Sequence, residues 1–129
     1  MITALYAGVC GALAVLLANH VLWVRLRTPS QPEWRPDAAL RVQANFVENV
    51  PLALVLLLIL ELNGTPPVWL HGFGASLVIL RGLHAFGLSR YEGANYPRLI
   101  GAQGTFVLLS IMAFALIYAY FKQANGGLL

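Results

Sequence analysis

The chain alternates between long apolar stretches and short polar ones. Four apolar stretches stand out, at about residues 2–24, 41–62, 67–88 and 98–121. Each has roughly the 20 residues that a helix needs to cross a hydrocarbon core about 30 Å thick. The pattern predicts an all-α, integral membrane four-helix bundle with up-down topology. We expect residues 1–129 to form one four-span domain without a separate soluble part.

Turn-forming residues separate the four predicted spans. The segment TPSQPEWRPDAA, with three prolines, follows the first span, and Asn63-Gly64 ends the second. Pro66-Pro67 then opens the third span, because proline suits the first turn of a helix. Pro51 lies inside the second span and predicts a bend, since it removes one backbone hydrogen bond. The first stretch is too long for a secretory signal and has no basic residue before it, so we expect a retained span.

Composition agrees with a membrane protein. Of the 129 residues, 59% are hydrophobic and 10% are charged, and the mean hydropathy is +0.72. A soluble domain of this size buries only about two-thirds of the surface of its unfolded chain, which is too little for this composition. Cys10 is the single cysteine. It predicts a buried free thiol, without a disulfide partner in the chain.

The basic residues predict an orientation. One set flanks the first and second spans or lies between them: Arg25, Arg27, Arg35 and Arg41. Arg90 and Arg98 flank the third connection, whereas the opposite side has only Lys122. By the positive-inside rule both termini face away from the cytoplasm. The net charge of +3 is therefore a topology signal, and the scattered arginines argue against a nucleic-acid surface.

Polar residues inside the apolar spans are the main functional clue. In RVQANFVENVP, Arg41, Asn45 and Glu48 share one helix face at positions i, i+4 and i+7. A charge near the middle of a bilayer costs about 2.5–3.5 kcal/mol by insertion measurements. The third span adds Arg81 and His84, three residues apart, and Arg98 begins the fourth. We expect these six side chains to converge on one cavity in the cytoplasmic half of the membrane.

Two interpretations of this constellation remain open. The charges pair across helices as a structural network, with Asn45 as an interhelical hydrogen bond. Alternatively the cavity binds a ligand, because three arginines and a histidine exceed the single carboxylate of Glu48. The surplus indicates a guest with at least one carboxylate, held by guanidinium groups, whose ammonium group meets Glu48. A small zwitterion such as glutathione has these groups.

Other kinds of site are disfavoured. The chain has one cysteine, and its three histidines lack metal-ligand spacing. It has no glycine-rich phosphate loop and no nucleophile elbow. The remaining polar and aromatic residues near span ends are predicted to lie at the membrane interface: Asn19, His20, Trp23, Trp34, Trp69, His71, Tyr118 and Tyr120.

These motifs resemble the membrane-associated proteins in eicosanoid and glutathione metabolism, the MAPEG family. RVQANFVENVP is similar to the second-helix signature of that family. VRLR at the end of the first span, RGLH in the third and YPRL at the start of the fourth resemble further family elements. The resemblance covers essentially the whole chain. The short loops are most similar to the bacterial, YecN-like branch, which implies a bacterial inner-membrane location.

The resemblance implies a homotrimer that binds glutathione between protomers at the cytoplasmic side. Its glutathione contacts are Arg25, Arg41, Asn45, Glu48, Arg81 and His84, and the catalytic residue is Arg98. Glu48 would hold the γ-glutamyl amine. Arg81 fits a direct contact, a structural role, or a role behind the residues that contact the ligand. A nearby guanidinium lowers the thiol pKa from about 8.5, which favours attack on an electrophile from the lipid. The implied activity is that of a glutathione transferase or peroxidase.

Two other functions compete with this one. A small multidrug-type transporter also has four short helices and a buried glutamate, but such a pump places its carboxylate in the first span. Residues 2–24 contain no acidic residue. The other alternative is a catalytically silent relative. Ala44, Leu88 and the pair Gly101-Ala102 stand where some family members carry polar side chains. The residues of the motif that bind the ligand are therefore better preserved than those that activate it.

Overall fold

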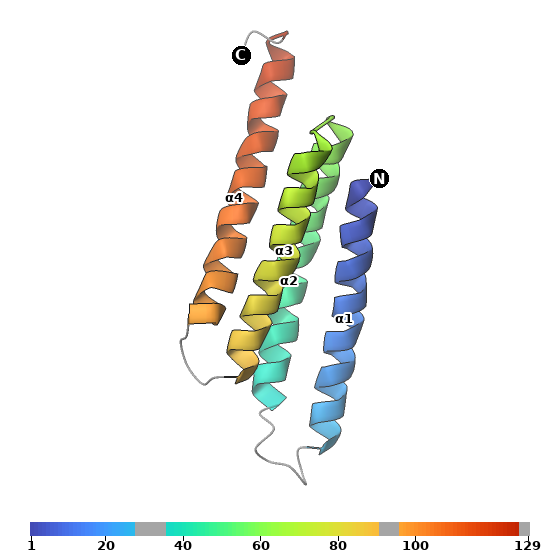
Figure 1. Ribbon diagram of the computed structural model, residues 1–129, viewed down its shortest axis with the longest axis vertical. Coiled ribbons are helices and arrows are strands. Elements are labelled where there is room, and N and C mark those ends of the chain that lie inside the picture. Colours follow the sequence, from blue (N-terminus) through green and yellow to red (C-terminus); the bar gives the residue numbers. More distant parts are fainter. Residues whose placement is uncertain (28–35, 91–95, 127–129) are drawn as a thin grey trace.

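The computed structural model describes residues 1–27, 36–90 and 96–126. Its four helices are α1 (Ile2–Arg27), α2 (Pro36–Leu62), α3 (Pro67–Arg90) and α4 (Tyr96–Ala124). Every helix extends past the predicted span by a few residues at one end or both. Successive helices run in opposite directions (Figure 1), which confirms the all-α, up-down arrangement.

The helices are not equivalent in position. α2 and α3 lie in the middle of the bundle, with α1 on one side and α4 on the other (Figure 1). α1 packs on α2 and α3, α4 packs on α3 and α2, and the described parts of α1 and α4 do not touch each other. The last turns of α1 and α3 lie at one end of the bundle, whereas the α2–α3 turn, the start of α1 and the last turn of α4 lie toward the other (Figure 1).

The predicted turn at Asn63-Gly64 is present and closes α2. Gly64 has a φ of +85°, a left-handed conformation that glycine adopts at no steric cost. Its N–H donates to the Glu61 carbonyl at 3.1 Å, and the Thr65 N–H donates to the Leu60 carbonyl at 3.1 Å. These two bonds form a Schellman cap. Pro67 then starts α3, where its missing N–H costs nothing.

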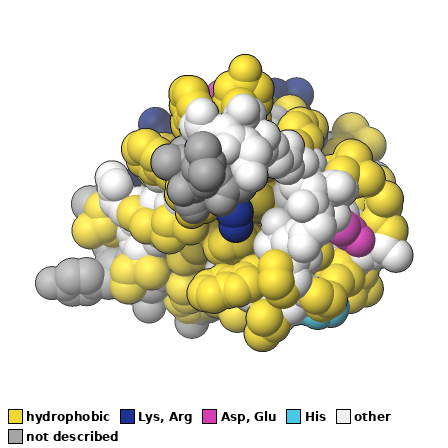
Figure 2. All heavy atoms as spheres, turned by 90° about the horizontal axis from the view of Figure 1, so that it is seen from above, with side chains coloured by type: hydrophobic (Ala, Val, Ile, Leu, Met, Phe, Trp, Pro, Cys, Tyr) yellow, Lys and Arg dark blue, Asp and Glu magenta, His cyan; other side chains and the backbone are white. Residues whose placement is uncertain are grey.

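The bundle interior is apolar, and so is most of its outer surface. Leu57, Leu77 and Met112 are each 1% exposed, and Cys10 is a buried free thiol, as predicted. Large hydrophobic side chains also cover the outside, including Phe114, which is 71% exposed. In the space-filling view from above, hydrophobic side chains form most of the visible outline (Figure 2). This is the surface expected of a helix bundle in contact with lipid.

Three of the described helices are long and apolar enough to cross a membrane: Ile2–Leu26, Ala39–Leu62 and Arg98–Ala124. The sequence pattern predicted four such spans, so α3 is the exception. It has 24 residues, which is sufficient length, but His71, Arg81 and His84 lower its apolar character. α3 nevertheless lies within the bundle, packed between α2 and α4. Arg81 and His84 of this helix are thus covered by its neighbours, whereas His71 near its start is exposed.

Candidate functional site

Arg81 on α3 is the centre of a polar cluster that joins three helices. Its side chain is 4% exposed. Nε and Nη2 donate to Oγ1 of Thr105 on α4, at 3.1 and 2.7 Å, and Nη2 donates to the Gly101 carbonyl at 3.0 Å. Nη1 donates to Oδ1 of Asn45 on α2. All of these acceptors are neutral, so the cluster is not a salt-bridge network.

The acceptors on α4, Thr105 and Gly101, lie near Arg81 because α3 and α4 approach each other closely. A Cβ atom added to Gly101 would lie 2.5 Å from the backbone nitrogen of His84 and 2.6 Å from the Leu80 carbonyl oxygen. Only glycine permits this distance between the two backbones. The Thr105 hydroxyl is fully buried and donates to the Gly101 carbonyl at 2.6 Å. Its lone pairs are therefore directed to Arg81.

Thr105 was not among the residues singled out from the sequence, whereas Gly101 was noted there as a departure from the family pattern. A threonine in an apolar helix is common and carries no distinctive spacing. The available signal was Gly101, four residues earlier on the same helix, because a glycine and a hydroxyl one turn apart suit a close helix crossing with a polar contact.

Arg41 and Glu48 take a different position from Asn45. Both are exposed on the outward face of α2, whereas Asn45 is half-buried at the edge of that face. Within the described part of the chain, neither Arg41 nor Glu48 has a hydrogen bond or an ion pair. The inward face of α2 carries Val42, Phe46 and other core residues. The stripe thus divides into one residue facing the interior and two charges facing outward.

His84, Arg98 and Arg25 complete the predicted set. His84 is 5% exposed and lies where α3 approaches Gly101. Arg98, near the start of α4, is half-buried, and its positive charge and that of Arg81 both act on the His84 ring. Arg25 is exposed in the last turns of α1. α1 and α4 lie on opposite sides of the central pair, so Arg25 and Arg98 are separated within one chain.

Two of the six span residues, Arg81 and His84, border one cavity in the described part of the chain. This cavity has a volume of about 70 Å³. Its remaining lining comes from Leu13, Leu17, Val42, Phe46, Gly82 and Ala85. Arg41 and Glu48 do not border it, because they lie on the opposite face of α2. The convergence of all six residues on one site stays a prediction.

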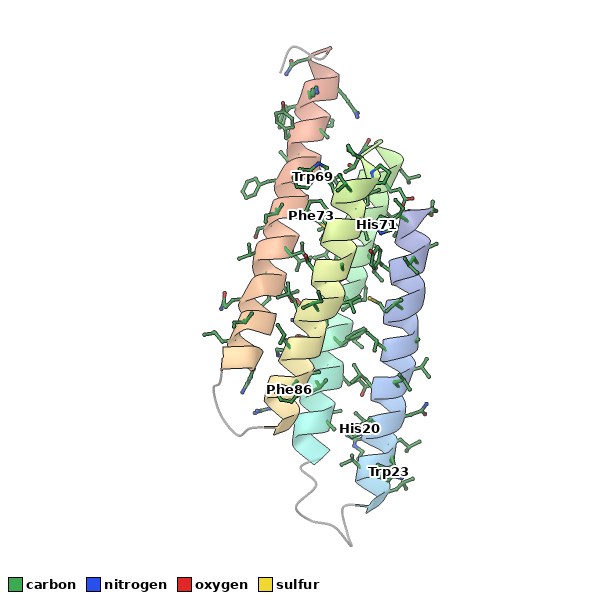
Figure 3. All side chains as sticks on the ribbon, in the orientation of Figure 1. His20, Trp23, Trp69, His71, Phe73 and Phe86 are labelled. Atoms are coloured by element: carbon green, nitrogen blue, oxygen red, sulfur yellow. The ribbon has the colours of Figure 1, made fainter. Side chains whose placement is uncertain are left out.

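A second polar cluster occupies the opposite end of the bundle. The Tyr6 hydroxyl lies 2.8 Å from Nδ1 and 3.2 Å from the carbonyl oxygen of His71. Glu61 of α2 accepts two backbone hydrogen bonds from α1. Figure 3 shows His71 and Trp69 toward this end, and His20 and Trp23 at the other. The described residues contain no group of three metal-binding side chains.

The chain was compared with known proteins. The model of the MAPEG family matches residues 3–118. The inner membrane protein YecN of Escherichia coli K12 is 30% identical, over 89% of each chain. YecN of the E. coli strain O6:H1 has the same identity and coverage. No solved structure matches the chain.

Proposed function

Because the chain belongs to the MAPEG family, we propose that it is a glutathione-dependent transferase or peroxidase acting on lipophilic electrophiles. The two activities would use the same thiol. The similarity to an inner membrane protein of E. coli supports a bacterial inner-membrane location. The arginine distribution supports an orientation with both termini on the non-cytoplasmic side.

One observation carries this proposal. Arg41 and Glu48 are exposed on the outward face of α2, inside or beside a 24-residue membrane span, Ala39–Leu62. Charges in such positions are costly in lipid and are normally covered by protein, ligand or water. The described part of the chain offers them no partner, and in lipid they need one. A neighbouring protomer and a charged ligand together would meet this need, which supports a homotrimer with its sites between protomers.

Glutathione has charged groups that are complementary to those on this face of α2. It has one ammonium group and two carboxylates, and the face has Glu48 and Arg41 one helical turn on either side of Asn45. In the proposed complex Glu48 binds the γ-glutamyl ammonium and Arg41 binds a carboxylate through its forked donors. Arg25, exposed on α1, would reach the ligand from an adjacent protomer.

Arg98 and His84 are the residues proposed to act near the sulfur. When bound, glutathione supplies a thiolate that forms a new sulfur–carbon bond with the electrophile, whose leaving group departs with the bonding electrons. A guanidinium near the sulfur stabilises the thiolate over the thiol. Arg98 is half-buried beside His84 at the start of α4, where partial burial strengthens this effect. The exposed apolar side chains around the bundle give a lipophilic substrate access from the membrane.

Titration calorimetry of glutathione into the detergent-purified protein tests this function. The ultraviolet absorbance of the thiolate is followed in the same samples. We expect saturable binding with thiolate at neutral pH, and a loss of affinity of about tenfold or more in Glu48→Gln and in Arg41→Ala. Lys122→Gln is the matched control, because it removes a charge at the far end of α4.

Each result has a distinct meaning. Binding with thiolate supports the transferase or peroxidase and justifies a screen of electrophiles. Binding without thiolate indicates a catalytically silent relative that retains the ligand. Absence of binding by the wild-type protein rejects the proposal, and unchanged affinity in both variants rejects the assignment of the site.

A further inference from the structure

The orientation of the Asn45 amide follows from its contact with Arg81. A guanidinium has only donors, so the amide atom that faces it must be the oxygen. Oδ1 of Asn45 accepts from Nη1 of Arg81. The amide nitrogen Nδ2 consequently lies on the other side of the group, away from the buried arginine. Within the described residues it has no hydrogen-bond partner.

The free donor is directed away from the bundle interior. Asn45 is half-buried and Arg81 is 4% exposed, so Oδ1 faces the buried arginine and we expect Nδ2 to face the outward edge of α2. Arg41 lies one turn before Asn45 on this helix and Glu48 lies three residues after it. Side chains at these spacings are neighbours on a helix surface. Nδ2 thus belongs to the outward face with Arg41 and Glu48.

Arg81 itself has little capacity left for a ligand. It makes four hydrogen bonds within the chain, and a guanidinium has five N–H donors. Three of these bonds go to Thr105 and Gly101 on α4, which hold the planar group in one orientation. The side chain is buried on the interior side of α2. A direct contact with a ligand on the outward face would require these bonds to break.

We propose that Arg81 is a positioning residue, anchored by Thr105, that aims Nδ2 of Asn45 at an oxygen of the ligand. This inference rests on the proposed glutathione site and selects, among the roles that the family resemblance left open for Arg81, the one in which it acts through Asn45. The oxygen belongs to the carboxylate next to the ammonium group that Glu48 binds, because Asn45 and Glu48 are neighbours on α2. Arg81 and Thr105 thereby shape the binding face of α2 without touching the ligand.

A double-mutant cycle on glutathione affinity tests the assignment. Arg81→Gln replaces a side chain that only donates hydrogen bonds by one that also accepts them. The Asn45 amide can then exchange the positions of its oxygen and nitrogen. We expect this variant and Asn45→Ala each to lose about tenfold in affinity. Arg81→Lys, which remains a pure donor, should recover most of the loss. In the Asn45→Ala background, Arg81→Gln should cause no further loss, since Arg81 acts only through the amide.

Other results decide against the inference in different ways. If Arg81→Gln weakens glutathione binding equally in the wild-type and the Asn45→Ala backgrounds, Arg81 contacts the ligand directly or acts on the whole fold. The assignment is then wrong. If wild-type protein fails to bind glutathione, the proposed function itself fails. Should Arg81→Gln not fold, Thr105→Val replaces it in the same cycle, because it removes only the hydroxyl that anchors Arg81.

Binding of a ligand analogue identifies the oxygen. Glutathione without its γ-glutamyl α-carboxylate retains the ammonium group and the thiol. For this analogue, Asn45→Ala should have no effect on affinity, whereas Glu48→Gln should still weaken binding. An equal effect of Asn45→Ala on glutathione and on the analogue would show that Nδ2 does not bind this carboxylate.

Discussion

The carboxylate of Glu61, in the last turn of α2, binds the backbone of Thr3 in the first turn of α1, with Oε2 2.6 Å from the Thr3 nitrogen. Its other oxygen, Oε1, lies 2.6 Å from the nitrogen of Ile2. The first N–H groups of a helix have no partner within it. A side chain of α2 thus caps α1 across 58 residues of sequence, and its negative charge also suits the positive end of the α1 dipole.

Glu61→Gln should weaken this cap. Glutamine retains one acceptor oxygen, but its amide nitrogen would face a second N–H group, and the favourable charge is lost. We expect the thermal unfolding midpoint in detergent to fall by a few degrees. Glu48→Gln is the matched control on the same helix, because Glu48 has no hydrogen bond within the described chain. Equal midpoints for both variants would contradict the capping role.

Gly101→Ala should destabilise the bundle by about 1–3 kcal/mol, the usual cost of overpacking. The new methyl would lie 2.5 Å from the His84 nitrogen, and backbone atoms there have little freedom to move aside. Thermal unfolding measures the effect. At Gly82 on α3 an added Cβ meets nothing within 4 Å, so Gly82→Ala should be neutral or slightly stabilising. An unchanged thermal unfolding midpoint in Gly101→Ala would mean that α3 and α4 are not so closely packed.

Tyr6→Phe should cost about 1 kcal/mol by removing the hydrogen bonds of the hydroxyl to His71. The ring should keep its place, because it packs against Gly74, where an added Cβ would lie 2.4 Å from it. The free energy of unfolding in detergent is the measurement. Tyr120→Phe serves as the control, since Tyr120 is 67% exposed. A similar loss at both positions would show that the Tyr6–His71 contact adds nothing to stability.

Cysteine cross-linking tests whether the outward face of α2 meets another protomer. In a Cys10→Ser background, Leu52→Cys places a thiol on this face, where Leu52 is 53% exposed. We expect a bismaleimide to join its protomers in membranes. Phe114→Cys, at a position 71% exposed on α4, should remain uncross-linked. Cross-linking at Phe114 and not at Leu52 would show that the interface between protomers lies on α4 rather than on the outward face of α2.

Much of the fold was predictable because its causes are local. A helix advances about 100° per residue, so the shared face of Arg41 and Glu48 follows from their spacing alone. The turn at Gly64 follows from the asparagine, glycine and prolines around it, and the apolar lengths follow from membrane thickness. The family was also recognisable from local motifs, and the match over residues 3–118 confirms it. These features depend on residues within a few turns of one another.

Only the tertiary structure decided which face of each helix meets its neighbours. The spacing of Arg41, Asn45 and Glu48 gave no reason to separate them. In the bundle Asn45 turns to Arg81, whereas Arg41 and Glu48 remain outside. The contacts that cause this come from Thr105 and Gly101 on α4, more than 50 residues later in the chain. Helix period determines which side chains share a face, but packing between helices determines what that face meets.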